Sequence, residues 1–437
     1  MKCQCRLEYF SAVAENQPAN KHRMNPELSS FAVRLRELIV VGDDVRSLHS
    51  NLEDGANNEP PHVGAYSKNF NALALELFSL QFKHNSAYRK ICEARNLTPE
   101  TVKDWTQIPA VPAAAFKELE LTSLAPEERT AVFHSSGTTE QKPSRHFHSA
   151  ESLAVYENSL WTWFEQNLIS NCGLRIADCG FVVLTPPPEQ APHSSLVHMF
   201  ETVRRKLGTP ESVFVGQIDA NGAWTLNYDA AFAALNSSLV TRHPSLLLGT
   251  AFSFVHLLDY LAEQDLRVGL PAGSRVMETG GYKNRSRTMP KNELRKLITE
   301  RLGVRPENII CEYGMSELSS QAYALGVPAS SRRGSAITTE EPAGWKPALP
   351  EQFRFPPWAR VQIISPETAC EAREGEIGLI RIFDLANTFS VMAIQTEDLG
   401  VRRGDGFELI GRAQLAEPRG CSLMSHSALR APHSALK

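Results

Sequence analysis

Long apolar runs are absent from this sequence. No stretch approaches the roughly 18 apolar residues that a membrane-spanning helix needs, and the start, MKCQCRLEYFSAVAENQ, has no apolar segment like that of a secretory signal. An excess of basic residues is also absent, because 45 Lys and Arg residues face 49 Asp and Glu residues and the formal net charge is -4. Nucleic-acid binders usually carry a basic surface. We therefore expect a cytoplasmic protein that spans no membrane and binds no nucleic acid.

Paired cysteines and a common catalytic motif are absent as well. The 8 cysteines in 437 residues do not make a disulfide framework, and none of them forms a C-x-x-C pair. Reduced thiols are therefore expected. No G-x-S-x-G sequence marks a serine hydrolase. The histidines His134, His146 and His148 could be read as metal ligands, but no carboxylate at helical spacing accompanies them.

The residues that are present can build a large core. Hydrophobic residues make up 42% of the chain, and its length exceeds that of one ordinary domain. Around SLLLGTAF an apolar strand is expected to run into a Gly-Thr loop and then a helix, in GSRVMETGGYKN a strand is followed by Gly280-Gly281, and in PENIICEYGMSE a strand is followed by a turn. Such repeated units predict an α/β fold with a mostly parallel sheet covered by helices. Ligands of such sheets bind at the carboxyl ends of the strands.

Four regions are expected along the chain. Residues 1–25 are expected to be disordered, with Met24 as an alternative start, and residues 26–350 to hold a helical N-terminal part and the α/β core. The short strands after about residue 355, among them GEIGLIRIF and FSVMAIQ, predict a β-rich subdomain over residues 351–411. Residues 412–437 are expected to form a short flexible tail.

The segment HSSGTTEQKPSRH, which begins at His134, is too rich in hydroxyl groups to be a buried strand. It lacks the second glycine of an ordinary P-loop. A hydroxyl-rich turn with one glycine can still wrap phosphate oxygens through side chains and backbone N–H groups. The alternative is a solvated loop.

Three further motifs carry candidate chemistry. In EYGMSE, Ser316 could bond a nucleotide phosphate and Glu317 could hold magnesium, or the pair could cap a helix. In QTEDLG, Asp398 follows a strand and could bond both ribose hydroxyls or fix a turn. In RGCSL, Cys421 lies between Gly420 and a serine, where it could react or could simply pack.

Taken in this order, the motifs resemble those of the adenylate-forming superfamily of acyl and aryl ligases. SSGTTEQKPS resembles its phosphate loop, YGMSE its Tyr-Gly-x-Thr-Glu motif, TEDLG its ribose-binding aspartate, and the Gly411-Arg412 pair its approach to the hinge. The acyl-protein synthetase (LuxE-like) branch is more similar still, over about residues 65–425, in segments such as HNSAYRKICEARN, IPAVPAAAFK, ETGGYKNRSR, FDLAN and RGCSL. The superfamily's swinging C-terminal domain, with its catalytic lysine, is expected to be truncated or absent, as the resemblance to that branch implies.

The resemblance implies the roles of individual residues. The expected phosphate-binding residues are Ser135, Ser136, Gly137, Thr138, Thr139 and Lys142. The expected AMP-binding residues are Gly280, Gly281, Tyr313, Gly314, Asp398 and Arg412. The expected acyl pocket is Gly249, Thr250, Ala251 and Phe252. The expected catalytic residues are Ser316, Glu317, which would hold magnesium, and Cys421.

The function that the resemblance implies is an AMP-forming acid–thiol ligase. It would use ATP and Mg²⁺ to convert a carboxylic acid, in this branch a long-chain fatty acid, to an acyl-adenylate, and then pass the acyl group to a protein cysteine. An acyl-accepting reductase or carrier protein would be the partner. Two alternatives stay open: a CoA ligase resembling phenylacetate–CoA ligases, and a nucleotide-binding module without catalysis.

Overall fold

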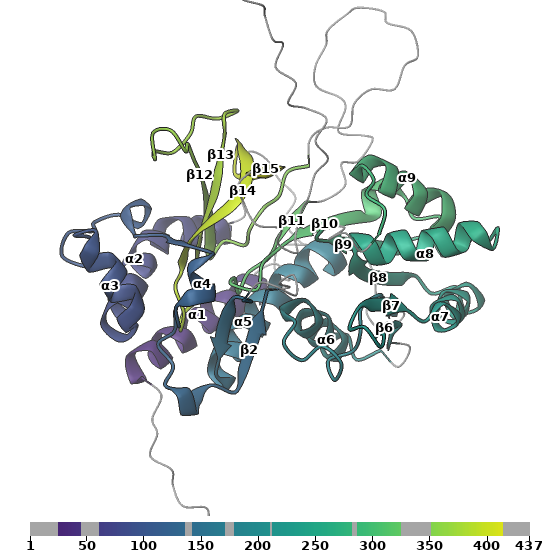
Figure 1. The fold of residues 1–437 in the computed structure, drawn as a ribbon, viewed down its shortest axis with the longest axis horizontal. Coiled ribbons are helices and arrows are strands. Elements are labelled where there is room, and N and C mark those ends of the chain that lie inside the picture. The colour runs from purple at the N-terminus through teal and green to yellow at the C-terminus, as the bar shows by residue number, and fades with distance from the viewer. Residues whose placement is uncertain are drawn as a thin grey trace, which may run out of the picture.

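Two large β-sheets and the helices packed on them dominate the computed structural model of the chain (Figure 1). The structure describes residues 25–44, 61–135, 142–170, 179–209, 212–281, 286–324 and 351–413. The helices within these ranges are α1 (Pro26–Asp44), α2 (Pro61–His84), α3 (Ser86–Ala94), α4 (Ala115–Glu118), α5 (Ala150–Phe164), α6 (Ser195–Leu207), α7 (Tyr228–Thr241), α8 (Ala251–Glu263) and α9 (Lys291–Leu302). Short helical turns are η1 (Trp105–Gln107), η2 (Pro126–Glu128), η3 (Glu165–Ile169) and η6 (Pro306–Asn308).

The first sheet has six strands in the order β11-β10-β9-β8-β4-β5. Its members are β4 (Gly180–Val183), β5 (Ser212–Phe214), β8 (Ser245–Thr250), β9 (Arg275–Thr279), β10 (Ile309–Tyr313) and β11 (Ala322–Ala324). All neighbours pair in parallel except β11, which is antiparallel to β10. The mostly parallel sheet expected from the sequence is thus confirmed.

Helices cover this sheet on both faces, so its central strands are apolar throughout. In β8 all residues are buried, as a strand with no solvent-facing side requires. Successive residues of the strands join two different cores: Leu247 and Val276 pack with α7, α8 and α9, whereas Leu248 and Met277 pack with α5 and α6. In Figure 1 the helices α6 to α9 surround the six-stranded sheet on the right.

The second sheet has five strands, drawn on the left in Figure 1. Its strands are β1 (Val111–Pro112), β12 (Ala359–Ile364), β13 (Ile377–Asp384), β14 (Ala393–Arg403) and β15 (Gly406–Arg412). Strand β1 pairs in parallel with the first half of β14, and β15 pairs with its second half. Residues of α1, α2 and α3 share one hydrophobic core with these strands. The N-terminal helices and the C-terminal strands therefore pack as one unit, although most of the chain separates them.

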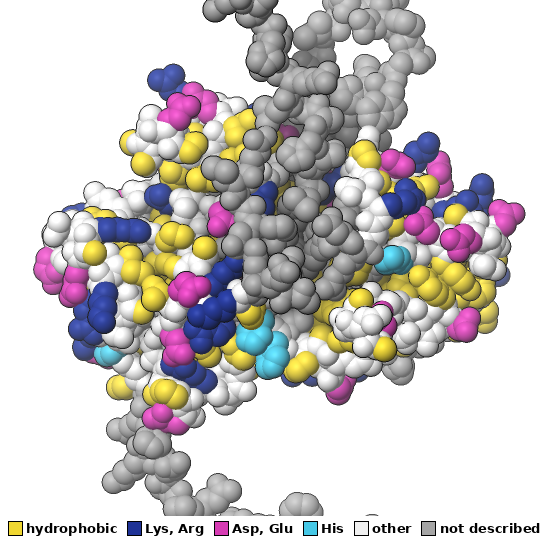
Figure 2. Space-filling view, in the orientation of Figure 1, with side chains coloured by type: hydrophobic (Ala, Val, Ile, Leu, Met, Phe, Trp, Pro, Cys, Tyr) yellow, Lys and Arg dark blue, Asp and Glu magenta, His cyan; other side chains and the backbone are white. Residues whose placement is uncertain are grey.

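Two hairpins complete the described strands. They are β2 (Ala131–His134) with β3 (Arg145–His148), and β6 (Gly216–Ile218) with β7 (Trp224–Leu226). None of the described helices combines the length and the apolar character needed to cross a bilayer. Acidic and basic side chains are interspersed over the face shown in Figure 2, in keeping with the small net charge.

The segment around Asp398 differs from the turn considered above. Strand β14 begins at Ala393 and runs on to Arg403, so the residues TEDLG lie inside a strand. Burial alternates there: Thr396 and Asp398 are buried, and Glu397 is half-buried. Polar residues on both sides of the strand hide the alternation of apolar and polar residues by which strands are recognised. The expected strand FSVMAIQ also starts later, at Ala393.

A single glutamine side chain joins α2 to the loop between β13 and β14. Gln81 is fully buried; its Nε2 donates to the carbonyls of Asn387 (2.8 Å) and Thr388 (3.2 Å), and its Oε1 accepts from the amide of Met392 (3.1 Å). We expect Gln81→Ala to lower the free energy of unfolding by about 2–4 kcal/mol, because it leaves buried backbone groups unpaired. Denaturant titration measures this change.

The control for Gln81→Ala is Glu76→Ala on the same helix. Glu76 forms an exposed ion pair with Arg34, which is worth less than about 1 kcal/mol. Equal destabilisation by the two variants would show that Gln81 adds nothing beyond an ordinary surface contact.

Candidate functional site

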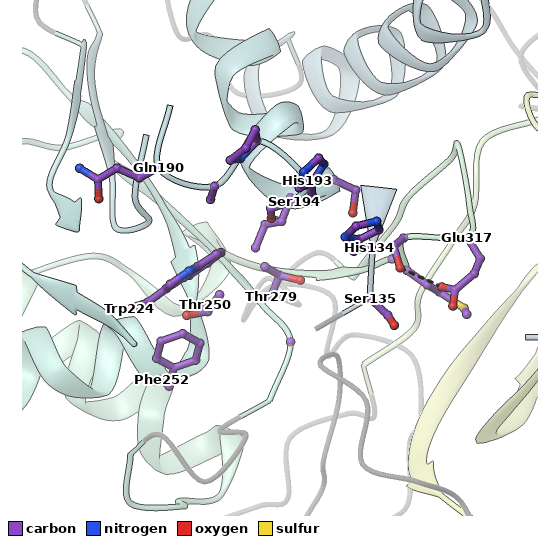
Figure 3. Close-up of a pocket in the computed structure, with 18 of the residues that line it drawn as sticks. His134, Ser135, Gln190, His193, Ser194, Trp224, Thr250, Phe252, Thr279 and Glu317 are labelled. Atoms are coloured by element: carbon purple, nitrogen blue, oxygen red, sulfur yellow. Dashed lines mark hydrogen bonds between the residues drawn. The ribbon is translucent and has the colours of Figure 1, made fainter. Parts of the chain in front are cut away.

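A cavity of about 370 Å³ lies beside the carboxyl ends of β8, β9 and β10 and extends to β14 (Figure 3). Parallel sheets bind their ligands at this edge. At one end the cavity is lined by hydroxyl, carboxylate and backbone groups of Ser135, Thr279, Gly280, Gly314, Ser316, Glu317 and Asp398. At the other end lie the rings of Trp224 and Phe252, with Thr250 and Gln190 on the same side (Figure 3), and the further apolar lining residues are Ala191, Pro192, Leu196, Met315 and Ile218. The cavity can thus hold a ligand with one charged and one apolar part.

The turn after β10 carries the carboxylate of Glu317 into the polar end. Glu317 is 1% exposed, and the hydroxyl of Ser316 donates to its Oε2 over 3.2 Å. The turn is tied on two sides: Asn387 Nδ2 donates to the carbonyl of Glu317 (2.9 Å), and His146 Nδ1 lies 3.0 Å from the carbonyl of Ser316. A carbonyl only accepts, so His146 carries its proton on Nδ1. Burial lowers the pKa of His146 to about 4, so it is neutral near pH 7.

The carboxylate of Asp398 approaches the cavity from β14. The hydroxyl of Tyr313 donates to its Oδ2 over 2.9 Å, and Tyr313 is itself fully buried among the rings of Phe353, Phe355 and Phe407. A rigid aromatic cluster therefore orients this carboxylate.

Arg412 pairs with Asp398 across β14 and β15. Its Nη2 bonds to Glu397, while its Nε and Nη1 are buried and meet no acceptor among residues within the described ranges. Buried guanidinium N–H groups without a partner are costly. They provide donors for an anionic or hydroxyl-bearing ligand.

A third carboxyl, that of Glu312, lies beside Gly314 of the cavity lining. A Cβ on Gly314 would come within 2.3 Å of Glu312 Oε1, which explains why glycine stands there. Burial raises the pKa of Glu312 to about 7, although the Thr279 hydroxyl that donates to it favours the charged form. Glu312 therefore titrates near neutral pH.

Two histidines flank the polar end beside the loop that begins at Ser135. The rings of His134 and His193 are stacked, with centroids 4.7 Å apart, and His193 Nδ1 lies 3.1 Å from the carbonyl of Val132. Burial lowers the pKa of His134, and the adjacent His193 and Arg145 lower it further. Both histidines line the cavity.

A family model described as "Acyl-protein synthetase, LuxE" matches residues 62–326, more than half of the chain. The chain belongs to this acyl-protein synthetase family. It is 22% identical over 369 residues to a long-chain-fatty-acid–luciferin-component ligase of Vibrio harveyi. The alignment covers 81% of this chain and 86% of the relative. A ligase of the same name from Aliivibrio fischeri is also 22% identical, over 80% of this chain and 86% of the relative.

Solved structures place this family member among the adenylate-forming ligases by fold. A 2-hydroxyisobutyryl-CoA ligase in an open conformation, in complex with 2-HIB-AMP and CoA, matches with a TM-score of 0.56 at 13% identity, over 82% of this chain and 73% of that chain. The same ligase in its thioesterification state matches with a TM-score of 0.54 at 14% identity, over 83% and 74% of the two chains. The expected α/β fold of adenylate-forming ligases is thereby confirmed.

Most of the site residues expected for an acyl-protein synthetase that the structure describes meet in this cavity. They are Ser135, Thr250, Phe252, Gly280, Gly314, Ser316, Glu317 and Asp398. Others lie near it without lining it, namely Gly249, Ala251, Gly281, Tyr313 and Arg412. The residues Ser136, Gly137, Thr138, Thr139 and Cys421 lie outside the described ranges.

Two of these residues face surroundings other than those expected. Lys142 Nζ lies 3.3 Å from a carboxylate oxygen of Glu118 in an exposed ion pair, away from the cavity lining. Gly249 has no room for a ligand, because a Cβ there would lie 2.9 Å from Leu184 Cβ. The cavity is instead lined one and three residues later, by Thr250 and Phe252.

Several lining residues were missed by sequence reasoning. Gln190, His193 and Trp224 come from the loop after β4 and from the hairpin β6–β7. The rule that loops at the carboxyl ends of parallel strands bind ligands also applies to the loop after β4. Polar residues behind its three prolines were therefore a usable signal for Gln190 and His193. No local pattern marks Trp224.

The raised pKa of Glu312 predicts a pH-dependent difference in stability. Protonated Glu312 is favoured by folding, so its contribution is fully present below about pH 4.5 and is lost as the pH rises through about 7. Glutamine mimics the protonated form. We expect the free energy of unfolding of Glu312→Gln, relative to the unmodified protein, to rise by about 3 kcal/mol between pH 4.5 and 7.5.

Denaturant titrations at a series of pH values measure the difference. Glu76→Gln, at an exposed position on α2, is the control and should show a flat difference. A flat difference for Glu312→Gln as well would show that Glu312 is ionised throughout this range.

Proposed function

We propose that this protein activates a fatty acid with ATP, forms an acyl-adenylate and pyrophosphate, and transfers the acyl group to a protein cysteine. The observation that carries the proposal is the single cavity with Ser135, Glu317 and Asp398 at one end and an apolar lining at the other. An acyl-adenylate likewise has a charged nucleotide part at one end and an apolar acyl tail at the other. The two relatives, which are named as long-chain-fatty-acid ligases, support a fatty acid as the substrate.

The phosphates of ATP would lie at the loop that starts at Ser135. Ser135 Oγ accepts from the amide of Ser144 over 3.0 Å, which closes the base of this loop. Ser136, Gly137, Thr138 and Thr139, which lie outside the described ranges, are the further phosphate ligands that we propose. Ser316 would bond the α-phosphate. No group of three or more acidic, histidine or cysteine side chains in the described ranges could hold a metal by itself. Mg²⁺, however, commonly takes one or two carboxylates and completes its shell with phosphate and water, so Glu317 fits such a site.

The nucleoside would lie between the two sheets. Asp398, oriented by Tyr313, would accept from both ribose hydroxyls, and the buried N–H groups of Arg412 would add donors close by. Gly280 has a φ of +71°, which only glycine adopts without strain. Its backbone can therefore approach the adenine closely, together with Gly281 and Gly314.

The reaction needs no proton transfer in its first step. A carboxylate oxygen of the acid attacks the α-phosphorus, the bond to the bridging oxygen breaks, and pyrophosphate leaves. Bound Mg²⁺ would offset the negative charge that develops on the phosphates. A thiolate then attacks the acyl carbon and AMP leaves. Since an ordinary thiol is only a few per cent ionised at neutral pH, the good leaving group supplies much of the driving force.

We assign the acceptor thiol to Cys421, from which an acyl-accepting reductase or carrier protein would take the acyl group. Among the described residues, Cys92, Cys179 and Cys311 are buried, and burial raises the pKa of all three thiols. Such thiols are poor nucleophiles. Cys370 is exposed but lies outside the cavity lining.

Glu317→Gln tests the adenylation site. The substitution keeps the shape of the side chain and removes its charge, and we expect pyrophosphate release to fall about a hundredfold to a thousandfold. Acid-dependent pyrophosphate release with a panel of fatty and aryl acids is the measurement, and circular dichroism checks the fold. Glu120→Gln, which alters an exposed ion pair with Arg129, should keep full activity. A folded Glu317→Gln protein with unchanged release would remove Glu317 from the mechanism.

Cys421→Ser tests the acceptor. The variant should still exchange pyrophosphate, because adenylation does not use the thiol, but should lose the acyl-protein adduct that neutral hydroxylamine cleaves. Mass spectrometry after turnover without CoA detects the adduct. Cys370→Ser is the matched control and should keep it. Retention of the adduct in Cys421→Ser, or efficient acylation of CoA by a protein that never forms one, would exclude the proposed role of Cys421.

A further inference from the structure

The apolar end of the cavity is lined by the hairpin β6–β7, which carries none of the proposed phosphate- or ribose-binding residues. Ile218 of β6 and Trp224 of β7 line the cavity from this hairpin. They face Phe252 on the first turn of α8. In Figure 3 Trp224 and Phe252 lie together, on the side of the cavity away from Glu317. An acyl tail whose carboxyl lies near Glu317 must therefore run toward these rings.

The hairpin is held firmly against the loop after β4. Gln190 Oε1 accepts from the amide of Ile218 over 2.8 Å, and the amide of Gly216 donates to the carbonyl of Thr185 over 3.2 Å. Gly216 packs so closely that an added Cβ would lie 2.2 Å from the backbone of Thr185. The turn of the hairpin is closed by Asp219, whose Oδ1 accepts from the amides of Asn221 and Ala223. These contacts therefore fix the backbone position of Trp224.

The rings of Trp224 and Phe252 pack together at the apolar end of the cavity. Trp224 and Phe252 lie with centroids 6.4 Å apart at an interplanar angle of 47°. Phe252 is 2% exposed and contacts His256 on its own helix, with ring centroids 6.4 Å apart. The buried Phe252 ring has little freedom to move aside, whereas Trp224 is only partly buried. Trp224 is thus the residue whose size decides how far a ligand extends.

The volume of the cavity limits what fits in front of these rings. Its total of about 370 Å³ is at the small end of the range of about 300–1,000 Å³ that holds drug-sized ligands. The polar end already has to take part of a nucleotide. Within this volume, the room left before Trp224 suits a compact tail, such as a short alkyl chain or one aromatic ring.

We propose that Trp224 is the specificity-determining residue of the acyl site and restricts this protein to carboxylic acids with compact tails. This inference rests on the proposed adenylation and narrows its substrate class. It would also distinguish this chain from the relatives named for long-chain fatty acids, which are 22% identical to it over about 80% of its length.

Acid-dependent exchange of pyrophosphate with ATP tests the inference on the full chain. The panel contains hexanoate, phenylacetate, decanoate and hexadecanoate. We expect kcat/KM of the unmodified protein to be at least about tenfold higher for hexanoate or phenylacetate than for hexadecanoate. Trp224→Ala should lower this ratio at least about tenfold by admitting the longer tails, and Trp224→Phe should change it less.

A variant of opposite effect and a control complete the design. Ile218→Trp adds a ring inside the cavity and should lower activity with decanoate more than with hexanoate, so it decides the question if Trp224→Ala fails to fold. Tyr228→Ala removes a neighbouring ring that stacks on Tyr260 outside the cavity lining and should leave the preference unchanged.

A protein that exchanges pyrophosphate with none of the acids in the panel would overturn the proposed function and this inference with it. A preference for hexadecanoate in the unmodified protein, or an unchanged preference in folded Trp224→Ala and Ile218→Trp, would overturn this inference alone.

Discussion

The buried carboxyl of Asp384, at the end of β13, connects the two sheets, and the geometry of the site depends on it. It accepts from the amides of Ser319 and Ala386, each at 3.0 Å, and from the hydroxyl of Ser320 at 2.7 Å. Ser319 and Ser320 belong to the turn that carries Glu317. Burial raises the pKa of Asp384 to about 6, while these donors favour its charged form. One side chain of the five-stranded sheet thus fixes a turn of the six-stranded sheet, and places Glu317 opposite Asp398.

What the sequence predicts well is local. The strands β8, β9 and β10 were predicted because each is a short apolar run that ends in polar residues or glycine; α8 follows β8 directly, α9 follows β9 after a loop, and β10 turns back into β11. Parallel strands bring the ends of such runs to one edge, so Gly280 and Glu317 could be expected at one site although far apart in sequence. The joint position of Gly280 and Glu317 follows from the order of strands and loops along the chain, without knowledge of side-chain contacts.

The features that differ from the sequence-based expectation, or that it missed, depend on contacts between distant residues. Asp398 was placed after a strand because a run of polar residues ordinarily ends one; here Tyr313 and the neighbouring β15 supply partners that let a carboxylate sit inside the sheet. Lys142 has the charge expected of a phosphate ligand, but Glu118 lies beside it. Trp224 enters the cavity only because its hairpin packs on Thr185 and Gln190. None of these pairings is encoded in spacing along the chain.

The two ends of the cavity are supported by separate sets of contacts. The polar end depends on Asp384, Tyr313 and Asn387, which bond between the two sheets. The apolar end depends on a hairpin bonded to the loop after β4, within the six-stranded half of the molecule. Substitutions at well-separated positions without shared partners act independently. A change in the hairpin can therefore alter the apolar end of the cavity without moving the carboxylates at the other end.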